Sequence, residues 1–466
     1  MIRKPLVALV YLVAACAGVP PVTTSGPAQP GTQTTPRISF EKYTLPNGLQ
    51  VILHEDHSTP IIAVNTWYHV GSGDEQPGRT GFAHLFEHIM FMGSQNVPVG
   101  MFDQWLEAAG ADNNGSTTED RTNYYEVLPS NALELALWLD SDRMGWLLPT
   151  MDLPKVDLQR DVVKNERRQG VDNVPYGRAD ETILAALYPK SHPYSWPVIG
   201  SMADLSAATL DDTRNFFRTY YAPNNATLAI AGDFDPAVAK QLVAKYFGPI
   251  PRGPAVNRRT TVPPVIIPSD KFLVLEDKVQ LPRLFYTWPT VKLFAPDDAA
   301  LDILAQVLAN DKNSRLYKKL VYDLQVAQHV RAFQESSRLT GKFQVDVLPK
   351  PEQATADIDR LVRAEIAGII SNGITQRELV RAQNSFRAQF LDRIASVLGK
   401  ADALNSYNYF AGTPDYVQQD AARYDRVTAA DVQRVASTYL GKPKIVLTVV
   451  PEGKKELMLS AAGGAQ

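Results

Sequence analysis

The chain has a single cysteine among its 466 residues. One thiol excludes an intramolecular disulfide framework and any metal site built from several cysteines, so histidine and carboxylate remain as ligands if a metal is bound. A charge of one sign is also lacking, because 47 basic residues face 50 acidic ones and the formal net charge is −3. This balance gives no electrostatic reason to expect nucleic-acid binding. The length indicates two or more domains in a folded, mildly acidic protein.

A hydrophobic run long enough to span a bilayer is missing at the N-terminus as well. The apolar stretch from Leu6 to Ala15 follows a short basic start and is too short for a membrane span. It predicts a signal peptide over residues 1–15. Residues 16–37 are rich in Pro, Thr and Gly, which predicts an unfolded tether.

The signal ends in Val-Ala-Ala-Cys, which resembles the bacterial lipobox, in which the cysteine becomes lipid-modified. An ordinary signal with an incidental cysteine is the alternative. The lipobox reading predicts an exported lipoprotein anchored at Cys16 on the periplasmic side of the envelope. Ala17 is not the aspartate that often signals inner-membrane retention, so the resemblance implies the outer membrane.

Beyond the tether the chain contains one pattern twice. An apolar strand, a loop and an apolar helix recur at residues 66–91 and 284–309, and a helix, a turn and an apolar strand recur at residues 210–235 and 427–453. Strands mixed with long helices, without a strict βαβ rhythm, predict two homologous α+β domains, each a mostly antiparallel sheet covered by helices. The predicted boundaries are a first domain at 38–250, a proline-rich linker at 251–268, a second domain at 269–456 and a flexible tail at 457–466.

The helix expected over residues 81–91 carries three polar groups in an otherwise apolar sequence. His84 and His88 are one turn apart, and Glu87 lies beside them. Hydrogen bonds to a neighbouring loop could satisfy these groups. The order His-x-x-Glu-His, however, is the inverse of H-E-x-x-H and is typical of a zinc peptidase class, in which the histidines bind zinc and the glutamate takes a proton from water. The aligned helix of the second copy has Asp302, Ala305 and Gln306 at these places.

A third ligand would have to come from elsewhere. Leu158, Val162 and Glu166 are spaced by four in the segment 153–170, so Glu166 is expected to continue an apolar stripe that faces the core. An inward carboxylate needs a partner. The partner could be a metal, or Arg167 or Arg168 could pair with it, or this face could be more exposed than its composition indicates.

From Tyr43 to Glu166 the chain closely resembles the pitrilysin or insulinase family of zinc metallopeptidases, through HLFEH, the Asn-Gly-Ser-Thr-Thr segment and the spacing to the glutamate. The resemblance implies that His84, His88 and Glu166 bind zinc and that Glu87 is the general base of peptide hydrolysis. It also implies that an extended substrate is held along a sheet edge at four positions. These positions are Asn114, Gly115, Ser116 and Thr117. A simple Asn-Gly turn is the alternative for this segment.

The chain departs from the family pattern near the metal. Gln159 stands where the family commonly has a second glutamate that steadies the metal site. An amide can hydrogen-bond a ligand but adds no negative charge, so the metal affinity is in question.

The second departure concerns an arginine and a tyrosine that active members use to hold substrate. The aligned positions here are Val321 and Gln328, whereas Arg315 and Tyr322 have the right separation two turns earlier. The resemblance therefore implies the two-subunit branch, in which a homologous partner chain carries the missing pair. A non-catalytic subunit of the same fold and a periplasmic peptide-binding lipoprotein are the competing interpretations.

Overall fold

The computed structural model describes residues 36–460. The predicted signal peptide, nearly all of the predicted tether and Cys16 lie outside the described residues, as does the chain from residue 461 on. Residues 36–460 fall within a single unit of contacts. None of the helices in this part of the chain combines the length and the hydropathy that a bilayer-spanning segment needs.

The first half of the chain builds a six-stranded sheet, sheet A, with the strand order β1-β2-β6-β3-β5-β4. Its pairs are antiparallel except β2 with β6. The strands are β1 (Glu41–Thr44), β2 (Gln50–Glu55), β3 (Ile61–Tyr68), β4 (Asp112–Thr117), β5 (Thr122–Pro129) and β6 (Ala226–Gly232).

The second half builds sheet B, with the order β7-β11-β8-β10-β9. Here too one pair is parallel, β7 with β11, and the rest are antiparallel. Strand for strand this repeats β2-β6-β3-β5-β4, so the predicted pair of homologous α+β domains is confirmed. The strands are β7 (Lys271–Asp277), β8 (Arg283–Thr290), β9 (Ala327–Ser336), β10 (Gly341–Pro349) and β11 (Ile445–Pro451).

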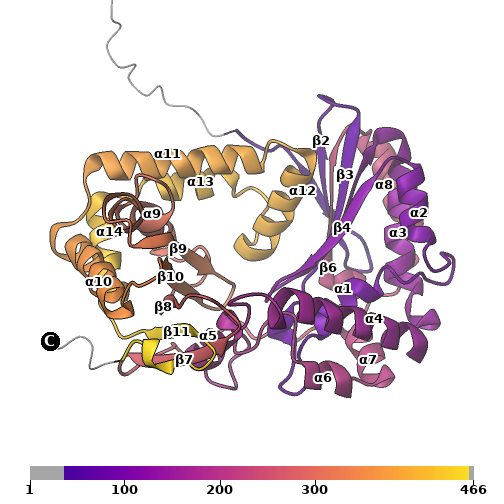
Figure 1. The fold of residues 1–466 in the computed structure, drawn as a ribbon. Helices are drawn as coiled ribbons and strands as arrows, with labels where there is room; N and C mark the ends of the chain where they lie inside the picture. The colour runs from indigo at the N-terminus through magenta and orange to yellow at the C-terminus, as the bar shows by residue number, and fades with distance from the viewer. Residues whose placement is uncertain (1–35, 461–466) are drawn as a thin grey trace, which may run out of the picture. The chain divides into compact units, whose positions relative to one another are not determined.

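Helices cover both sheets, and each sheet has an apolar core on its helix-covered face (Figure 1). The helices of the first half are α1 (Phe82–Ile89), α2 (Met101–Ala108), α3 (Leu133–Trp146), α4 (Leu153–Arg167), α5 (Ala179–Leu187), α6 (Met202–Ala207), α7 (Leu210–Tyr220) and α8 (Pro236–Phe247). Those of the second half are α9 (Asp298–Ala309), α10 (Thr355–Asn372), α11 (Gln376–Arg393), α12 (Val397–Ser406), α13 (Val417–Asp425) and α14 (Ala429–Val435).

The two halves share a third core. Helix α12 of the second half packs on the face of sheet A that α1 does not cover, where Ala401 and Leu404 meet Ile52 and Ala63. Asp402 of α12 also accepts hydrogen bonds from side chains of β3. The central strands of sheet A are therefore buried on both faces, and the two edges of the sheet are β1 and β4.

The ends of the predicted linker and tail can be compared with the described residues. Residues 251–267 contain no helix or strand, in keeping with a linker. At the C-terminal end, Leu459 is buried and its backbone N–H donates to the Thr448 hydroxyl at 3.1 Å. Leu459 therefore packs against the core of the second half, and the flexible tail over residues 457–466 stays a prediction.

Candidate metal centre

Helix α1 carries the polar cluster and is buried on nearly all sides. Gly81 begins it with a φ of 88°, a left-handed conformation that favours glycine. A Cβ at this position would also lie 2.8 Å from the Ile199 carbonyl oxygen. The apolar residues of the helix are buried, His84 is buried beside them, and Glu87 and His88 are partly exposed. The polar groups therefore face the one open side of the helix.

Glu75 holds the start of α1, a role that the sequence analysis missed. One carboxylate oxygen accepts from the backbone N–H of Gly81 at 3.0 Å and the other from that of Ala83 at 2.8 Å. These are N–H groups that a helix start leaves unpaired, and negative charge is favourable there. Burial raises the pKa of the Glu75 carboxyl, and the two N–H groups oppose that shift. The signal available in the sequence was an acidic residue just before a buried helix.

Helix α4 brings in the third polar group, although on a different face from the one expected. It begins after Asp152, whose side chain accepts from the Lys155 backbone N–H at 3.0 Å. Leu158 and Val162 are exposed, with 53% and 39% of their surface accessible, and the Glu166 side chain is half exposed. The expectation of a core-facing stripe is wrong. Residues one position further along, such as Val163 and Arg167, are the ones that pack inward.

Arg167 does not neutralise Glu166. Its guanidinium donates to the Gly200 carbonyl and pairs with Glu181 at 2.8 Å. Arg168 donates to Asn165 instead. Both arginines that could have served Glu166 are thus engaged elsewhere, and the carboxylate points toward α1.

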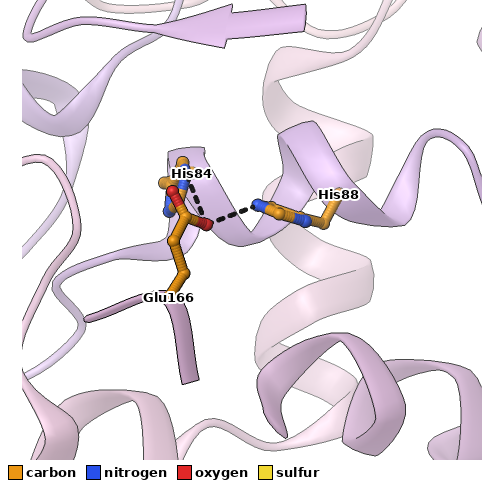
Figure 2. A group of neighbouring side chains, drawn as sticks. All are labelled: His84, His88 and Glu166. Atoms are coloured by element: carbon orange, nitrogen blue, oxygen red, sulfur yellow. Dashed lines mark ion pairs between the residues drawn. The ribbon is translucent and has the colours of Figure 1, made fainter. Parts of the chain in front are cut away.

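Figure 2 shows the Glu166 carboxylate lying between the two imidazoles of α1. Its Oε2 is 3.6 Å from His84 Nε2 and 3.2 Å from His88 Nε2. These three residues are the one group of His, Cys, Asp or Glu side chains with metal-binding geometry among residues 36–460. Tetrahedral zinc with ligands at about 2.0–2.1 Å holds its donor atoms about 3.3 Å apart. The spacing and the donor types therefore fit zinc.

The protonation state of the cluster suits a metal ligand. Burial lowers the pKa of the His84 imidazole to about 4, with the charge of Glu166 partly opposing this. His84 is thus neutral at physiological pH, and the neutral imidazole is the form that coordinates a metal. The rings of His84 and His88 are nearly perpendicular, with centroids 4.9 Å apart, so both ring nitrogens can approach one point.

Glu87 lies next to the cluster without being part of it. Its Oε2 accepts a hydrogen bond of 2.6 Å from the Thr117 hydroxyl. Burial raises the pKa of this carboxyl, and the hydrogen bond from Thr117 opposes the shift. Gly115 makes room for it, because a Cβ there would lie 3.0 Å from the Glu87 Cγ. A carboxylate with a raised pKa beside a metal-binding group is suited to accept and return a proton.

The Asn-Gly-Ser-Thr segment is a strand and not a turn. Asn114 to Thr117 lie in β4, an edge strand of sheet A, which among residues 36–460 pairs with β5 alone. Because Thr118 N–H bonds to the Arg121 carbonyl at 2.9 Å, the even-numbered residues of β4 pair with β5. The main-chain groups of residues 113, 115 and 117 therefore point away from the sheet, beside Glu87.

Gln159 has found another partner. It is buried on α4, and its amide contacts the Met92 sulfur at 2.7 Å. No hydrogen bond from it to His84, His88 or Glu166 is present among the described residues. Its amide therefore contacts the segment that follows α1 and not the three candidate metal ligands.

In the second half of the chain, the residues aligned with the cluster form hydrogen bonds with neighbouring side chains. On α9, Gln306 donates to the Ser385 hydroxyl at 2.9 Å, and Asp302 accepts from the Tyr424 hydroxyl at 2.7 Å. Burial, followed by the charge of Asp298, raises the pKa of Asp302 to about 8. Two histidines are thus replaced by groups that bind their own neighbours.

Replacing Asp302 with asparagine should stabilise the protein in a pH-dependent way. Folding raises the pKa of the Asp302 carboxyl to about 8. Its contribution to the free energy of unfolding is therefore fully present below the pKa of the unfolded state and falls as the pH rises toward 8. Asparagine keeps the acceptor for Tyr424 without the charge. The free energy of unfolding of Asp302→Asn should exceed that of the wild type by about 1 kcal/mol or more near pH 8, and the gain should vanish near pH 4. An equal effect at both pH values would contradict the assignment.

The substrate-holding pair is absent from the aligned positions. Val321 packs against the core of the second half, and Gln328 is exposed at the start of β9. Arg315 pairs with Glu378 through two hydrogen bonds of 2.7 and 2.9 Å. Tyr322 is 73% exposed. Arg315 would have to break a bidentate ion pair to replace the missing arginine, and this weakens it as a substitute.

Two family models match the chain. Insulinase (peptidase family M16) matches residues 50–194, and the peptidase M16 inactive domain matches residues 207–386. The first match contains both histidines and Glu166. The second reaches from the end of the first half through much of the second, including helix α9, where the cluster is replaced.

Similar proteins and structures agree with the two family-model matches. Zinc protease PqqE of Helicobacter pylori is 30% identical over 411 residues, which cover 86% of this chain and 90% of that protein. A probable mitochondrial-processing peptidase subunit beta of Arabidopsis thaliana is 24% identical, covering 87% of this chain and 77% of that protein. The crystal structure of a protease from Helicobacter pylori superposes with a TM-score of 0.81 at 26% identity and covers 89% of this chain and 100% of that chain. The resemblance inferred from the motif is thereby confirmed, and the chain belongs to the insulinase family of peptidases, M16.

Proposed function

We propose that this protein is a zinc-dependent endopeptidase that hydrolyses peptides or unfolded segments. The convergence of His84, His88 and Glu166 at donor distances of 3.2 and 3.6 Å, with Glu87 on the same helix, carries this proposal. The name of the Helicobacter pylori relative, a zinc protease, supports it. Hydrolysis of an unstructured peptide that is lost on chelation and restored by zinc would test it.

The residues divide the chemistry between them. His84, His88 and Glu166 would hold the metal, which when bound would lower the pKa of water and polarise a carbonyl. Glu87 accepts the proton of the attacking water and returns it to the leaving amine. Thr117 orients Glu87 through its hydroxyl. Glu75 keeps α1, and with it both histidines, in place.

The edge of sheet A is proposed to hold the substrate. The outward main-chain groups of residues 113, 115 and 117 can pair with an extended peptide as an added strand, at positions Asn114 to Thr117. The Gly115 N–H donates to the Asn114 Oδ1 at 2.8 Å, and an added strand would replace this hydrogen bond. Such pairing reads the backbone and leaves the side chains free. Thr117 lies at the end of this edge and touches Glu87, so an added strand would pass the general base.

A homologous partner chain is proposed to complete the enzyme. Val321 and Gln328 cannot supply the arginine and tyrosine, and a symmetric homodimer would leave both copies with the same defect. The Arabidopsis thaliana relative is named as a subunit, which supports this arrangement. We expect the isolated chain to hydrolyse peptides poorly and to gain activity with a co-expressed homologue that carries the pair. Full activity of the isolated chain, lost in Arg315→Ala or Tyr322→Phe, would instead make Arg315 and Tyr322 the working pair.

The N-terminal sequence supports export and a lipid anchor. We expect the mature chain to begin at a lipid-modified Cys16 and to face the periplasm, with the outer membrane as its destination. Mass spectrometry of the purified full-length protein should find no residues 1–15. A Cys16→Ser variant should be released from the membrane fraction. An unmodified Cys16 or a retained signal would rule out the anchor.

A further inference from the structure

A cavity of about 440 Å³ lies on the face of sheet B against which α5 packs, apart from the candidate metal centre. Its walls come from both halves, with the segment from Pro175 to Ile183 on one side and strands β8, β9 and β10 on the other. The first wall is pinned in place, because the Tyr176 hydroxyl donates to the Leu281 carbonyl at 2.9 Å and its backbone N–H donates to Asp277 at 2.8 Å. The cavity is therefore a built feature of the fold.

The strand register orders the side chains on the β10 and β9 side of the cavity. Lys342, Gln344 and Asp346 follow one another along β10, and the residues opposite them on β9 are Glu335, Phe333 and Arg331. Lys342 pairs with Asp180 at 3.1 Å and with Glu335 at 3.3 Å, so this end carries two negative charges against one positive charge.

The opposite end has the reverse balance. The buried carboxylate of Asp346 is shared by two guanidinium groups, those of Arg283 and Arg331. One negative charge thus faces two positive charges, which leaves an excess cation at this end.

Arg331 has hydrogen-bond donors that no described residue accepts. Its Nε contacts both oxygens of Asp346, at 3.1 and 3.0 Å. Neither terminal nitrogen has a partner among the described residues, and the side chain is 50% exposed. The guanidinium carbon lies 4.9 Å from the centre of the Phe333 ring, so the ring packs against the guanidinium group. A planar guanidinium with free terminal N–H groups matches the two oxygens of a carboxylate.

A hydrogen bond links the turn beside the Glu335 end of the cavity to the hairpin of the candidate substrate edge. Thr117, which touches Glu87, leads into the β4–β5 hairpin, where Asp120 accepts from the Arg338 backbone N–H at 2.8 Å. Arg338 lies in the turn that joins β9 to β10, beside the Glu335 end of the cavity. A strand added to β4 would therefore have a contacting element of sheet B at the Thr117 end of its path.

We propose that this cavity is a substrate-recognition site for a carboxylate, held by the terminal nitrogens of Arg331 above the Phe333 ring. The carboxylate is that of an acidic side chain or of a peptide C-terminus. The inference rests on the proposed peptidase function and makes this enzyme select peptides with a negative charge away from the cleaved bond.

Peptide binding to the Glu87→Gln protein tests this without turnover. A short, unstructured peptide with one Glu and an amidated end is compared with the same peptide carrying Gln, and with the Gln peptide carrying a free C-terminal carboxylate. Measured by fluorescence anisotropy, at least one carboxylate peptide should bind about tenfold more tightly than the neutral one. Which of the two does so identifies the source of the charge.

Variants identify the residue responsible. Arg331→Ala in the same background should remove the preference, and Arg331→Lys, which keeps the charge but not the planar fork, should keep only part of it. Arg283 still pairs with Asp346 in both, and thermal unfolding checks that the fold is kept. Arg360→Ala is the control, because Arg360 is an exposed residue of α10 outside the cavity, paired with Asp357.

Equal affinity for all three peptides, no binding of any of them, or the same loss in Arg360→Ala as in Arg331→Ala would overturn the proposal. The peptidase function fails separately. If the protein never hydrolyses peptides but keeps the Arg331-dependent preference, the carboxylate site stands and the peptidase function fails. If it hydrolyses peptides without this preference, the peptidase function stands and the carboxylate site fails.

Discussion

Replacing Glu87 with glutamine should lower peptide hydrolysis by about 10²- to 10⁴-fold, the usual contribution of a general base. The substitution removes the proton acceptor and little else. An amide oxygen can still accept the hydrogen bond from Thr117, and the metal-binding atoms of His84, His88 and Glu166 are untouched. We therefore expect unchanged zinc content, measured by inductively coupled plasma mass spectrometry on the protein used for kinetics.

The control for this variant is Glu107→Gln, on the exposed face of α2. It changes the same charge at a position that has no part in the site and should leave the rate unaltered. Wild-type turnover by Glu87→Gln would remove Glu87 from the mechanism. A loss of zinc along with activity would make it a ligand or a structural support instead.

Replacing Glu166 with alanine should strongly lower the affinity of the protein for zinc. Disturbing groups that merely support a ligand already lowers metal affinity by about 10- to 100-fold, so losing one of three ligands should lower it at least that much. The fold should survive, because the Glu166 side chain is half exposed and pairs only with His84 and His88 in the described structure.

Isothermal titration of metal-depleted protein with zinc would measure this loss. Asp161→Ala is the matched control, an exposed carboxylate on the same helix α4 away from the cluster. Full zinc affinity in Glu166→Ala would place the third ligand elsewhere. The same weakening in Asp161→Ala would show that the change acts through the helix and not through coordination.

Local patterns in the sequence predicted the elements that carry the chemistry. The apolar run around His84 predicted α1, because a helix with almost no polar face must be buried. The repeated order of strand, loop and helix predicted the duplicated sheets. These features depend on neighbours in the sequence, which periodicity describes well.

Features that depend on tertiary packing were harder to predict. Glu166 was chosen because it continued the stripe of Leu158 and Val162, yet that stripe is exposed. The Glu166 side chain nevertheless lies beside His84 and His88. Glu166 lies at the border of the buried face of α4, seven residues after the buried Gln159, and its carboxylate reaches the two histidines of α1. Periodicity shows that a helix has two faces but not which face meets the core, especially when both carry apolar residues.

The sequence analysis did not predict several further contacts. Glu75 caps α1 through backbone groups, and the acidic residue just before a buried helix was the signal for it. The Arg331 cavity needs β9, β10 and the segment after α4 to meet. The Asn-Gly pair of β4 favours a turn by local preference, whereas the family resemblance implied the sheet edge that its pairing with β5 forms.

The most direct test of the zinc-peptidase account is peptide hydrolysis during zinc titration of the metal-depleted protein, prepared with any homologous chain that co-purifies. The account predicts no hydrolysis without metal and a rise that saturates at one zinc per chain, with no such rise in Glu166→Ala. Hydrolysis that persists after complete metal removal, or that shows the same zinc response in Glu166→Ala, would contradict it.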